Sequence, residues 1–154
     1  MSDIEKKLKE LNIELPGEPK AMGTYRPARW SGNTIYLSGN GPMKNGKLIY
    51  TGKLGKDLTI EEGYDAARLS IINIIGVLKY ELGDLDRIEK FVKLLGFVAS
   101  TDDFYEQPSV INGASDLLVE VFGEKGMHAR SAIGTSVLPF NLPVEIEVMV
   151  EIKE

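Results

Sequence analysis

Arg130 and Glu145 are the two residues of this chain whose types and spacing point most clearly to chemistry. They lie fifteen positions apart in the stretch "HARSAIGTSVLPFNLPVEIEV", which begins at residue 128 and otherwise has the apolar alternation of buried strands. An arginine early in an apolar strand must lie at a solvated edge or be paired, because an unpaired buried charge is costly. The prolines of "LPFNLP" confine the connection to a loop, which can bring the two strands side by side. We therefore expect Glu145 to lie near Arg130.

The residues alone leave two interpretations of this pair open. It is either a structural ion pair at the surface, which stabilises a fold very little, or part of a ligand site. In a site, the planar guanidinium binds a carboxylate through two parallel hydrogen bonds.

The composition excludes several other kinds of site. The chain has no cysteine, so disulfides, thiolate catalysis and cysteine-ligated metals are excluded. His128 is the only histidine, so a multi-histidine metal site is excluded too. A lone loop histidine with no acid at a telling distance is more often exposed or structural than catalytic. The glycine-rich pieces "SGNGP" and "KNGK" lack the spacing of phosphate-binding loops and indicate turns.

The charge and the hydropathy of the chain limit the classes of partner that it can bind. The net charge of −5 with a pI near 5.0 argues against binding a nucleic-acid backbone by bulk electrostatics. No cationic, apolar signal segment opens the chain, and no run of about 18 apolar residues could span a bilayer. These features favour a soluble cytoplasmic protein without a membrane or nucleic-acid partner.

Helices and strands follow from periodicity and turn residues. Ser2 is a good N-cap for a short peripheral helix, and Gly32-Asn33 is a turn pair between strand-like stretches at 28–30 and 34–37. The clearest helix runs from Thr59 to Leu82, and a second runs from about Ser109 to Phe122. Further strands are expected around 46–55 and at 88–100, 129–137 and 144–152.

These 154 residues are the size of one domain that can bury a core without disulfides or metals. We expect a single α+β domain over residues 1–154, in which two long helices cover one face of a sheet.

Four stretches, in order, resemble the RidA/YjgF family of reactive-intermediate imine deaminases, also called L-PSP endoribonuclease-like proteins. They are "SGNGP" at Ser38–Pro42, the segment from "EEGYDAARLS" to "FVASTDDF", "VINGASDLLVEVFG", and the A-R-S signature followed by the "VEIEV" strand. The resemblance covers about residues 20 to 152, and residues 1–12 form a helical N-terminal extension.

The resemblance implies a chorismate-mutase-like (YjgF) fold with a mixed sheet, and a homotrimer with pockets at its subunit interfaces. It implies that Arg130 binds the substrate carboxylate and that Glu145 positions the attacking water. It also places the remaining substrate-binding positions at Tyr25, Ser38, Gly39, Asn112 and Ala132.

The implied activity is hydrolytic deamination of 2-enamine and 2-imine carboxylates, of the 2-aminoacrylate and 2-iminobutanoate type, to 2-oxo acids and ammonia. This reaction requires no metal and no cofactor. Two features depart from the usual pattern: Ala132 stands where the family usually has cysteine, and the N-terminal helix is additional. A non-catalytic trimer that binds small carboxylates or ketoacids as a sensor is the alternative. Ribonuclease activity is disfavoured because the chain is acidic and has no aromatic–basic stripe.

Overall fold

A five-stranded mixed sheet organises the computed structural model, which describes residues 1–20 and 23–154. Its strand order is β1-β2-β7-β5-β6. The pair β5–β6 is parallel and the other neighbours are antiparallel. The bounds are β1 (Ala28–Ser31), β2 (Thr34–Leu37), β5 (Ile88–Ala99), β6 (Ala129–Thr135) and β7 (Val144–Ile152). A separate hairpin is formed by β3 (Met43–Lys44) and β4 (Lys47–Leu48).

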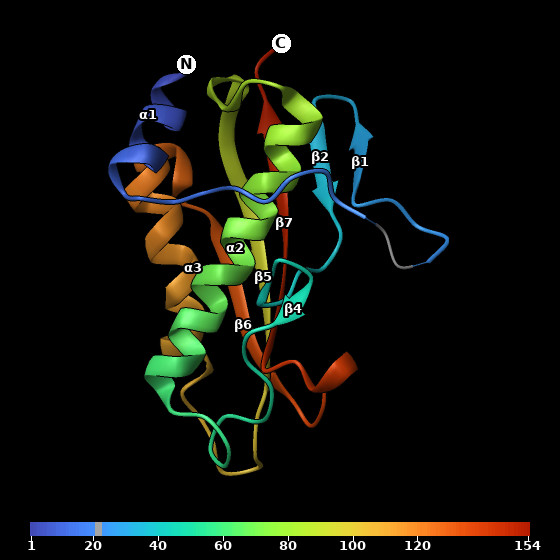
Figure 1. Cartoon of the computed structure of the whole chain (residues 1–154), viewed down its shortest axis with the longest axis vertical. Helices are drawn as coiled ribbons and strands as arrows, with labels where there is room; N and C mark the ends of the chain where they lie inside the picture. Colours follow the sequence, from blue (N-terminus) through green and yellow to red (C-terminus); the bar gives the residue numbers. More distant parts are fainter. Residues whose placement is uncertain (21–22) are drawn as a thin grey trace.

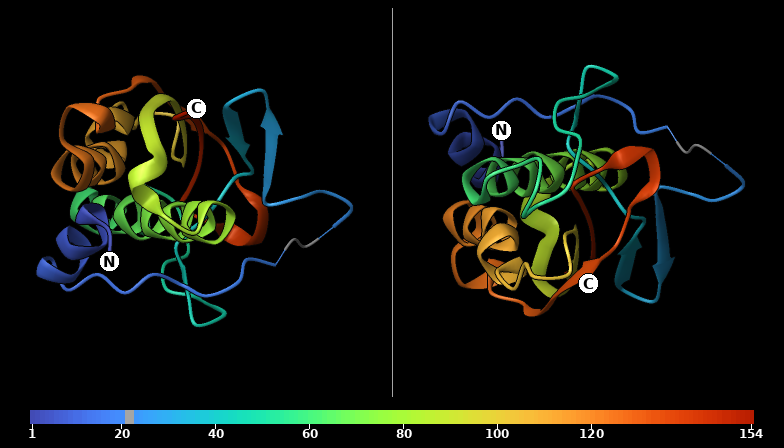
Figure 2. Two further views of the ribbon diagram at one scale, coloured as in Figure 1. Left: turned by 90° about the horizontal axis from the view of Figure 1, so that it is seen from above. Right: turned by 90° about the horizontal axis from the view of Figure 1, so that it is seen from below.

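Two long helices cover one face of this sheet. Helix α2 (Ile60–Leu82) begins at the Thr59–Glu62 capping box, in which each side chain binds the other residue's backbone N–H. Helix α3 (Gln107–Phe122) begins two residues before the expected start, because Pro108 fits the first turn of a helix. Figures 1 and 2 show α2 and α3 side by side against the strands, with the β1–β2 hairpin on the opposite side of the molecule from α3. The predicted α+β architecture is confirmed.

The two faces of β7 differ in burial, and this difference decides which side chains are free for function. One row of alternating residues packs under the helices and is fully or almost fully buried: Val144, Ile146, Val148, Val150 and Ile152. Each such side chain contributes roughly 1.5–3 kcal/mol by leaving water. The other row consists of Glu145, Glu147, Met149 and Glu151, which are only half-buried on the open face.

The N-terminal segment crosses the outer side of α2 and packs on it (Figure 1). Helix α1 (Asp3–Glu10) has a capping box of Ser2 and Glu5, and its side chain Leu8 enters the core. Farther along, Pro16 packs so closely on Gly76 of α2 that a Cβ at residue 76 would lie 2.6 Å from the proline ring.

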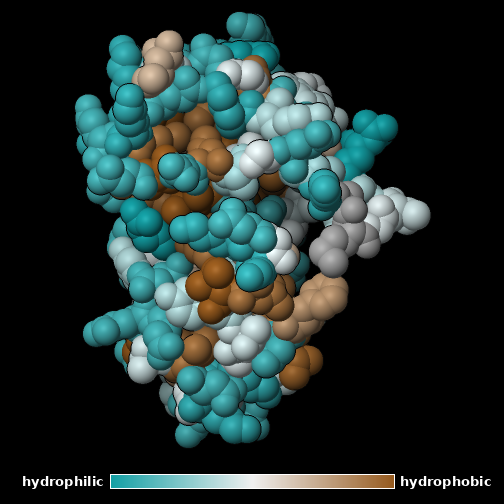
Figure 3. All heavy atoms as spheres, in the orientation of Figure 1, coloured by the Kyte–Doolittle hydropathy of each residue, from teal (hydrophilic) through white to brown (hydrophobic). Residues whose placement is uncertain are grey.

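Three short 3₁₀ turns join the elements: Leu85–Arg87 before β5, Gly123–Gly126 before β6 and Pro139–Asn141 before β7. None of the helices in the described ranges is long and apolar enough to cross a membrane. In the view of Figure 3, apolar side chains show between hydrophilic ones on the helix-covered side.

Candidate functional site

The strands that carry Arg130 and Glu145 are not neighbours, so the expectation that their loop brings them side by side is wrong. Strand β5 lies between β6 and β7. Arg130 is in register with Leu94 of β5, and Glu145 is in register with Phe97 of the same strand. The reason is long-range: the long strand β5 pairs with both strands and so lies between them.

The two side chains also point to opposite faces of the sheet. Leu94, the register partner of Arg130, is fully buried on the helix-covered face, whereas Glu145 belongs to the open-face row of β7. The Cα atoms of Arg130 and Glu145 are about 14 Å apart, because two strand spacings and an offset of three residues along the strands lie between them. Neither residue forms an ion pair within the described ranges, so the interpretation as a structural ion pair is wrong for a single subunit.

Arg130 is held by two side chains of α3. Its Nη1 donates to Asn112 Oδ1 at 2.8 Å and to Ser115 Oγ at 3.2 Å. Both bonds use the same nitrogen, and no hydrogen bond joins Nε or Nη2 to another described residue. The Nε–Nη2 edge is therefore available to a bidentate acceptor such as a carboxylate. Ala132 follows two positions later on the same face of β6.

His128 belongs to this cluster as well. Its Nε2 lies 2.9 Å from Ser115 Oγ, and its Nδ1 lies 2.7 Å from the carbonyl oxygen of Gly126. Burial is the main cause that lowers the pKa of His128, and the nearby charge of Arg130 lowers it further, against the Gly126 bond, which raises it. The imidazole is therefore neutral at neutral pH.

The turn before β6 places this histidine. Gly126 packs against α3 so tightly that a Cβ would lie 2.1 Å from the carbonyl oxygen of Leu118. The chain thus leaves α3 and returns directly beside it, which brings residue 128 next to Ser115.

Glu145 forms a second group, with the loop that follows β2. A Cβ at Gly39 would lie 2.5 Å from Glu145 Oε1, so the carboxylate rests directly on the glycine backbone. Reciprocal backbone hydrogen bonds of 2.8 and 2.9 Å between Asn40 and Ile146 hold this loop to β7. Ser38 Oγ donates to the carbonyl of Arg26 at 2.6 Å, which fixes the approach of the loop. Burial, and secondarily the charge of Glu147, raise the pKa of Glu145, which suits a general base.

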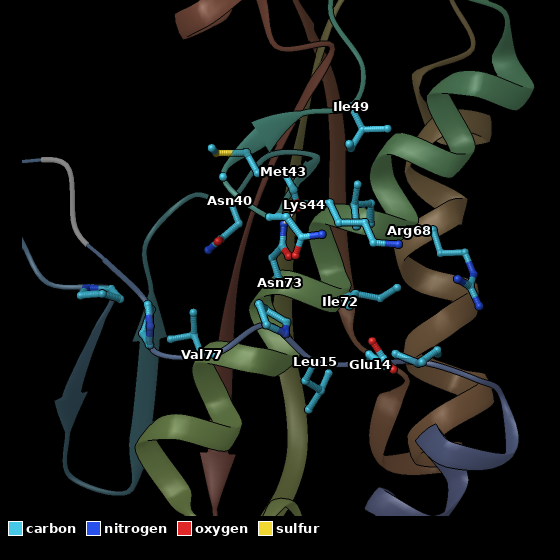
Figure 4. A pocket seen from close by; sticks show the side chains of 18 of the residues that line it. Glu14, Leu15, Asn40, Met43, Lys44, Ile49, Arg68, Ile72, Asn73 and Val77 are labelled. Atoms are coloured by element: carbon cyan, nitrogen blue, oxygen red, sulfur yellow. Dashed lines mark hydrogen bonds between the residues drawn. The ribbon is translucent and has the colours of Figure 1, made fainter.

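Tyr25 lies near the Ser38–Gly39 end of an open groove of about 1110 Å³ and is 56% exposed. The groove continues between the N-terminal segment, the β3–β4 hairpin and α2. Figure 4 shows its wall of mixed character, with Lys44, Arg68, Ile49 and Ile72 among the labelled side chains.

The predicted site residues therefore fall into two groups within one chain. Arg130 and Ala132 of β6 are grouped with Asn112 of α3 on the helix-covered face. Glu145 of the open-face row is grouped with Gly39 and Ser38, and Tyr25 lies at the groove. The described residues contain no cluster of three or more histidine, cysteine or acidic side chains that could hold a metal.

Sequence reasoning missed that Ser115 and His128 contact each other beside Arg130. The available signals were spacings: Ser115 follows Asn112 by three residues on a helix, and His128 precedes Arg130 by two on a strand. Both spacings place side chains on one face. That this face of α3 packs against this face of β6 is visible only in the folded structure.

Comparisons with known proteins agree with this architecture. Residues 5–152 match the family model described as YjgF/chorismate mutase-like, whose description also names an endoribonuclease. Protein TCP17 of Trypanosoma cruzi is 42% identical over 146 residues, which cover 94% of this chain and 91% of that protein. A 2-iminobutanoate/2-iminopropanoate deaminase of Dermatophagoides farinae is 30% identical over 142 residues, or 92% and 95% of the two chains.

Among solved structures, the protein Atu1372 of Agrobacterium tumefaciens superimposes with a TM-score of 0.92 at 46% identity, covering 98% of this chain and 93% of that one. Fold, sequence and family model thus agree over nearly the whole length. This chain is a member of the RidA/YjgF family.

Proposed function

We propose that this protein is a hydrolytic deaminase of 2-imino carboxylates, and that it produces 2-oxo acids and ammonia. The observation that carries the proposal is the arrangement of Arg130. Asn112 and Ser115 take both bonds at Nη1, so the Nε–Nη2 edge remains for the two oxygens of a substrate carboxylate. The deaminase name of the Dermatophagoides farinae relative supports the same reaction class.

The separation of Arg130 and Glu145 supports a site shared between subunits. Within one chain these side chains lie on opposite faces of the sheet, so a single pocket that uses both needs a second copy of the chain. We propose a homotrimer in which Arg130 of one subunit faces Glu145 of the next.

The open face of the sheet offers a surface for this assembly. Tyr36 and Ile133 are 45% and 46% exposed there, and Phe97 and Met149 lie half-buried on the same face. Covering these side chains with another subunit would remove apolar surface from water, which favours association.

The chemistry needs only a carboxylate clamp and a base. The substrate carries a protonated imine nitrogen, which makes its carbon electrophilic. Glu145 accepts a proton from water while the oxygen forms a bond to that carbon and the C=N π electrons move to nitrogen. The tetrahedral intermediate then takes a proton on nitrogen, the C–N bond breaks, ammonia leaves, and the hydroxyl loses its proton to form the C=O bond. Water supplies the oxygen, so no redox partner is consumed.

A coupled assay tests this proposal. An enzyme that generates 2-aminoacrylate from serine, or 2-iminobutanoate from threonine, is run with and without the protein while 2-oxo acid release is followed. We expect faster release with the protein and a large loss with Arg130→Lys, because lysine keeps the charge but not the planar fork. Near-normal rates with both Arg130→Lys and Arg130→Ala would contradict the clamp. Carboxylate binding without any acceleration would instead identify a non-catalytic binding protein.

A further inference from the structure

A chain of hydrogen bonds leads from a backbone carbonyl to the guanidinium of Arg130. The carbonyl of Gly126 can only accept, so Nδ1 of His128 must carry the hydrogen of that 2.7 Å bond. In the neutral ring Nε2 then has a lone pair, and the Ser115 hydroxyl must donate to it across 2.9 Å. The Ser115 oxygen is left to accept from Arg130 Nη1. Every bond in the chain therefore has a defined direction.

A serine inside a helix can donate its hydrogen to the carbonyl four residues earlier. Ser70 does so in α2, where its hydroxyl donates to the carbonyl of Ala66 at 2.8 Å. The corresponding acceptor for Ser115 would be the carbonyl of Ile111. His128 provides a different acceptor, so the Ser115 hydroxyl is turned toward β6 and presents its lone pairs to Arg130.

We propose that His128 is a positioning residue for Arg130: acting through Ser115, it holds Nη1 against α3 and keeps the Nε–Nη2 edge turned to the ligand carboxylate. This inference rests on the proposed function in so far as the ligand is a carboxylate. It assigns a role to a histidine that does not itself touch the substrate.

The protonation state of His128 decides whether this chain of hydrogen bonds can form. Arg130 is the charged group whose charge lowers the pKa of His128. The other nearby charged groups are bound elsewhere: Asp116 of α3 accepts from Tyr64, and Lys125 of the preceding turn donates to the Ile88 carbonyl. Protonation of Nε2 would remove the lone pair that accepts from Ser115, so the arrangement that holds Arg130 requires the neutral ring. The carboxylate should therefore bind less tightly as the pH falls through the pKa of His128.

The first measurement uses the fact that His128 is the only histidine of the chain. Imidazole ¹⁵N labelling then gives one pair of ring signals, without overlap. We expect the Nδ1–H tautomer at pH 7.5 both in the ligand-free protein and on saturation with pyruvate. A protonated ring in the pyruvate complex would contradict the positioning role. The Nε2–H tautomer in the ligand-free protein would overturn the proposal.

The second measurement is the affinity for pyruvate, by calorimetry at pH 7.5. Ser115→Ala and His128→Ala should weaken binding about 3- to 10-fold, the effect expected for one hydrogen bond in a network with a charged group. His128→Gln should stay within about twofold, because its amide oxygen can accept from Ser115. Ser70→Ala is the matched control, since it removes a mid-helix hydroxyl of α2 that has no contact with Arg130. Unchanged affinity with both alanine variants at positions 115 and 128 would contradict the positioning role.

A third measurement separates this inference from the proposed function. Rotation of the Arg130 guanidinium about its Cζ–Nε bond is followed by ¹⁵N relaxation without ligand, with the signal assigned by its loss in Arg130→Lys. Faster rotation in Ser115→Ala and His128→Ala supports positioning even if pyruvate fails to bind, and that failure would count only against the carboxylate site. Equal rotation in all three proteins would overturn the inference itself.

Discussion

The carboxylate of Glu145 lies against the backbone of Gly39, so that a Cβ added at residue 39 would be 2.5 Å from Oε1 and 2.9 Å from Cδ. This contact joins two segments that are more than one hundred residues apart in the chain. Real Cβ atoms do not approach other atoms so closely, and the glycine therefore determines where the glutamate can lie.

Gly39→Ala should displace Glu145 and reduce hydrolysis, because the carboxylate has to leave the place where it meets the attacking water. Gly39 has no left-handed backbone angle, so the cost is the steric contact alone, and the carboxylate end can swing away with little loss of stability. We expect at least a tenfold fall in rate, in line with the sensitivity of catalysis to misplacement of about 1 Å. The coupled assay and thermal unfolding measure the two effects.

Gly17→Ala is the control for that variant. A Cβ at residue 17 would have no neighbour within 4 Å, so both rate and stability should remain close to those of the unsubstituted protein. Equal rates for Gly39→Ala and Gly17→Ala would show that the Gly39 contact does not position the base.

Glu145→Gln separates an enzyme from a carboxylate-binding protein. The side chain lies in the open-face row, so the substitution leaves the core intact, and the amide keeps hydrogen-bonding capacity without a base. Hydrolysis should fall by roughly 10²–10⁴-fold, the usual contribution of a general base, while pyruvate still binds through Arg130. Glu147→Gln, two residues later on the same face, is the matched control and should retain most of the activity. Unchanged hydrolysis in Glu145→Gln would exclude the general-base role.

The same variant should change stability with pH. Burial raises the pKa of Glu145 above its value in the unfolded chain, so its stabilising contribution is complete below the unfolded pKa and is lost as the pH rises through the folded pKa. Glu145→Gln removes this loss and should raise Tm at pH 7.5, but much less at pH 4.5. Thermal unfolding at both pH values measures it, and a lower Tm at pH 7.5 would contradict the direction of the shift.

The pH dependence of stability that His128 causes should have the opposite sign to that of Glu145. Its pKa is lowered in the folded protein, mainly by burial, so its stabilising contribution is present above the unfolded pKa of about 6.5 and is lost as the pH falls through the folded pKa. The stability advantage over His128→Gln should therefore be larger at pH 8 than at pH 5. Urea unfolding of the two proteins at both pH values tests this, and an advantage that grows toward pH 5 would show that the folded pKa is raised.

Subunit mixing tests whether one pocket draws on two chains. We expect a particle near three times 17.0 kDa by light scattering. Arg130→Ala and Glu145→Gln proteins, each inactive alone, are unfolded together and refolded as mixed trimers. If the pocket combines Arg130 of one subunit with Glu145 of its neighbour, random assembly restores about a quarter of the sites.

Two outcomes would count against that arrangement. No recovery of activity in the mixture would mean that both residues act within one subunit, and a monomer at micromolar concentration would remove the shared pocket altogether. Refolding of each variant alone serves as the control for incomplete mixing.

Much of the local structure could be predicted from residues close together in the chain. The capping box of Thr59 and Glu62, the Gly32-Asn33 turn and the alternation along β7 all depend on neighbouring residues, whose energetics are nearly independent of the fold. The alternation of apolar and polar residues from 144 to 152 likewise places Glu145 on the face away from the core. The motif resemblance then predicted the family without any knowledge of strand order.

Strand order and the grouping of site residues were decided by the tertiary structure. The proline loop between β6 and β7 is compatible with neighbouring strands, yet β5 separates them, because pairing depends on burial and hydrogen bonds contributed by distant segments. Arg130 therefore lies against α3 and far from Glu145. The contacts of Ser115 with His128 and of Gly39 with Glu145 likewise arise only when helix, turn and strand pack together, since no local spacing determines which faces meet.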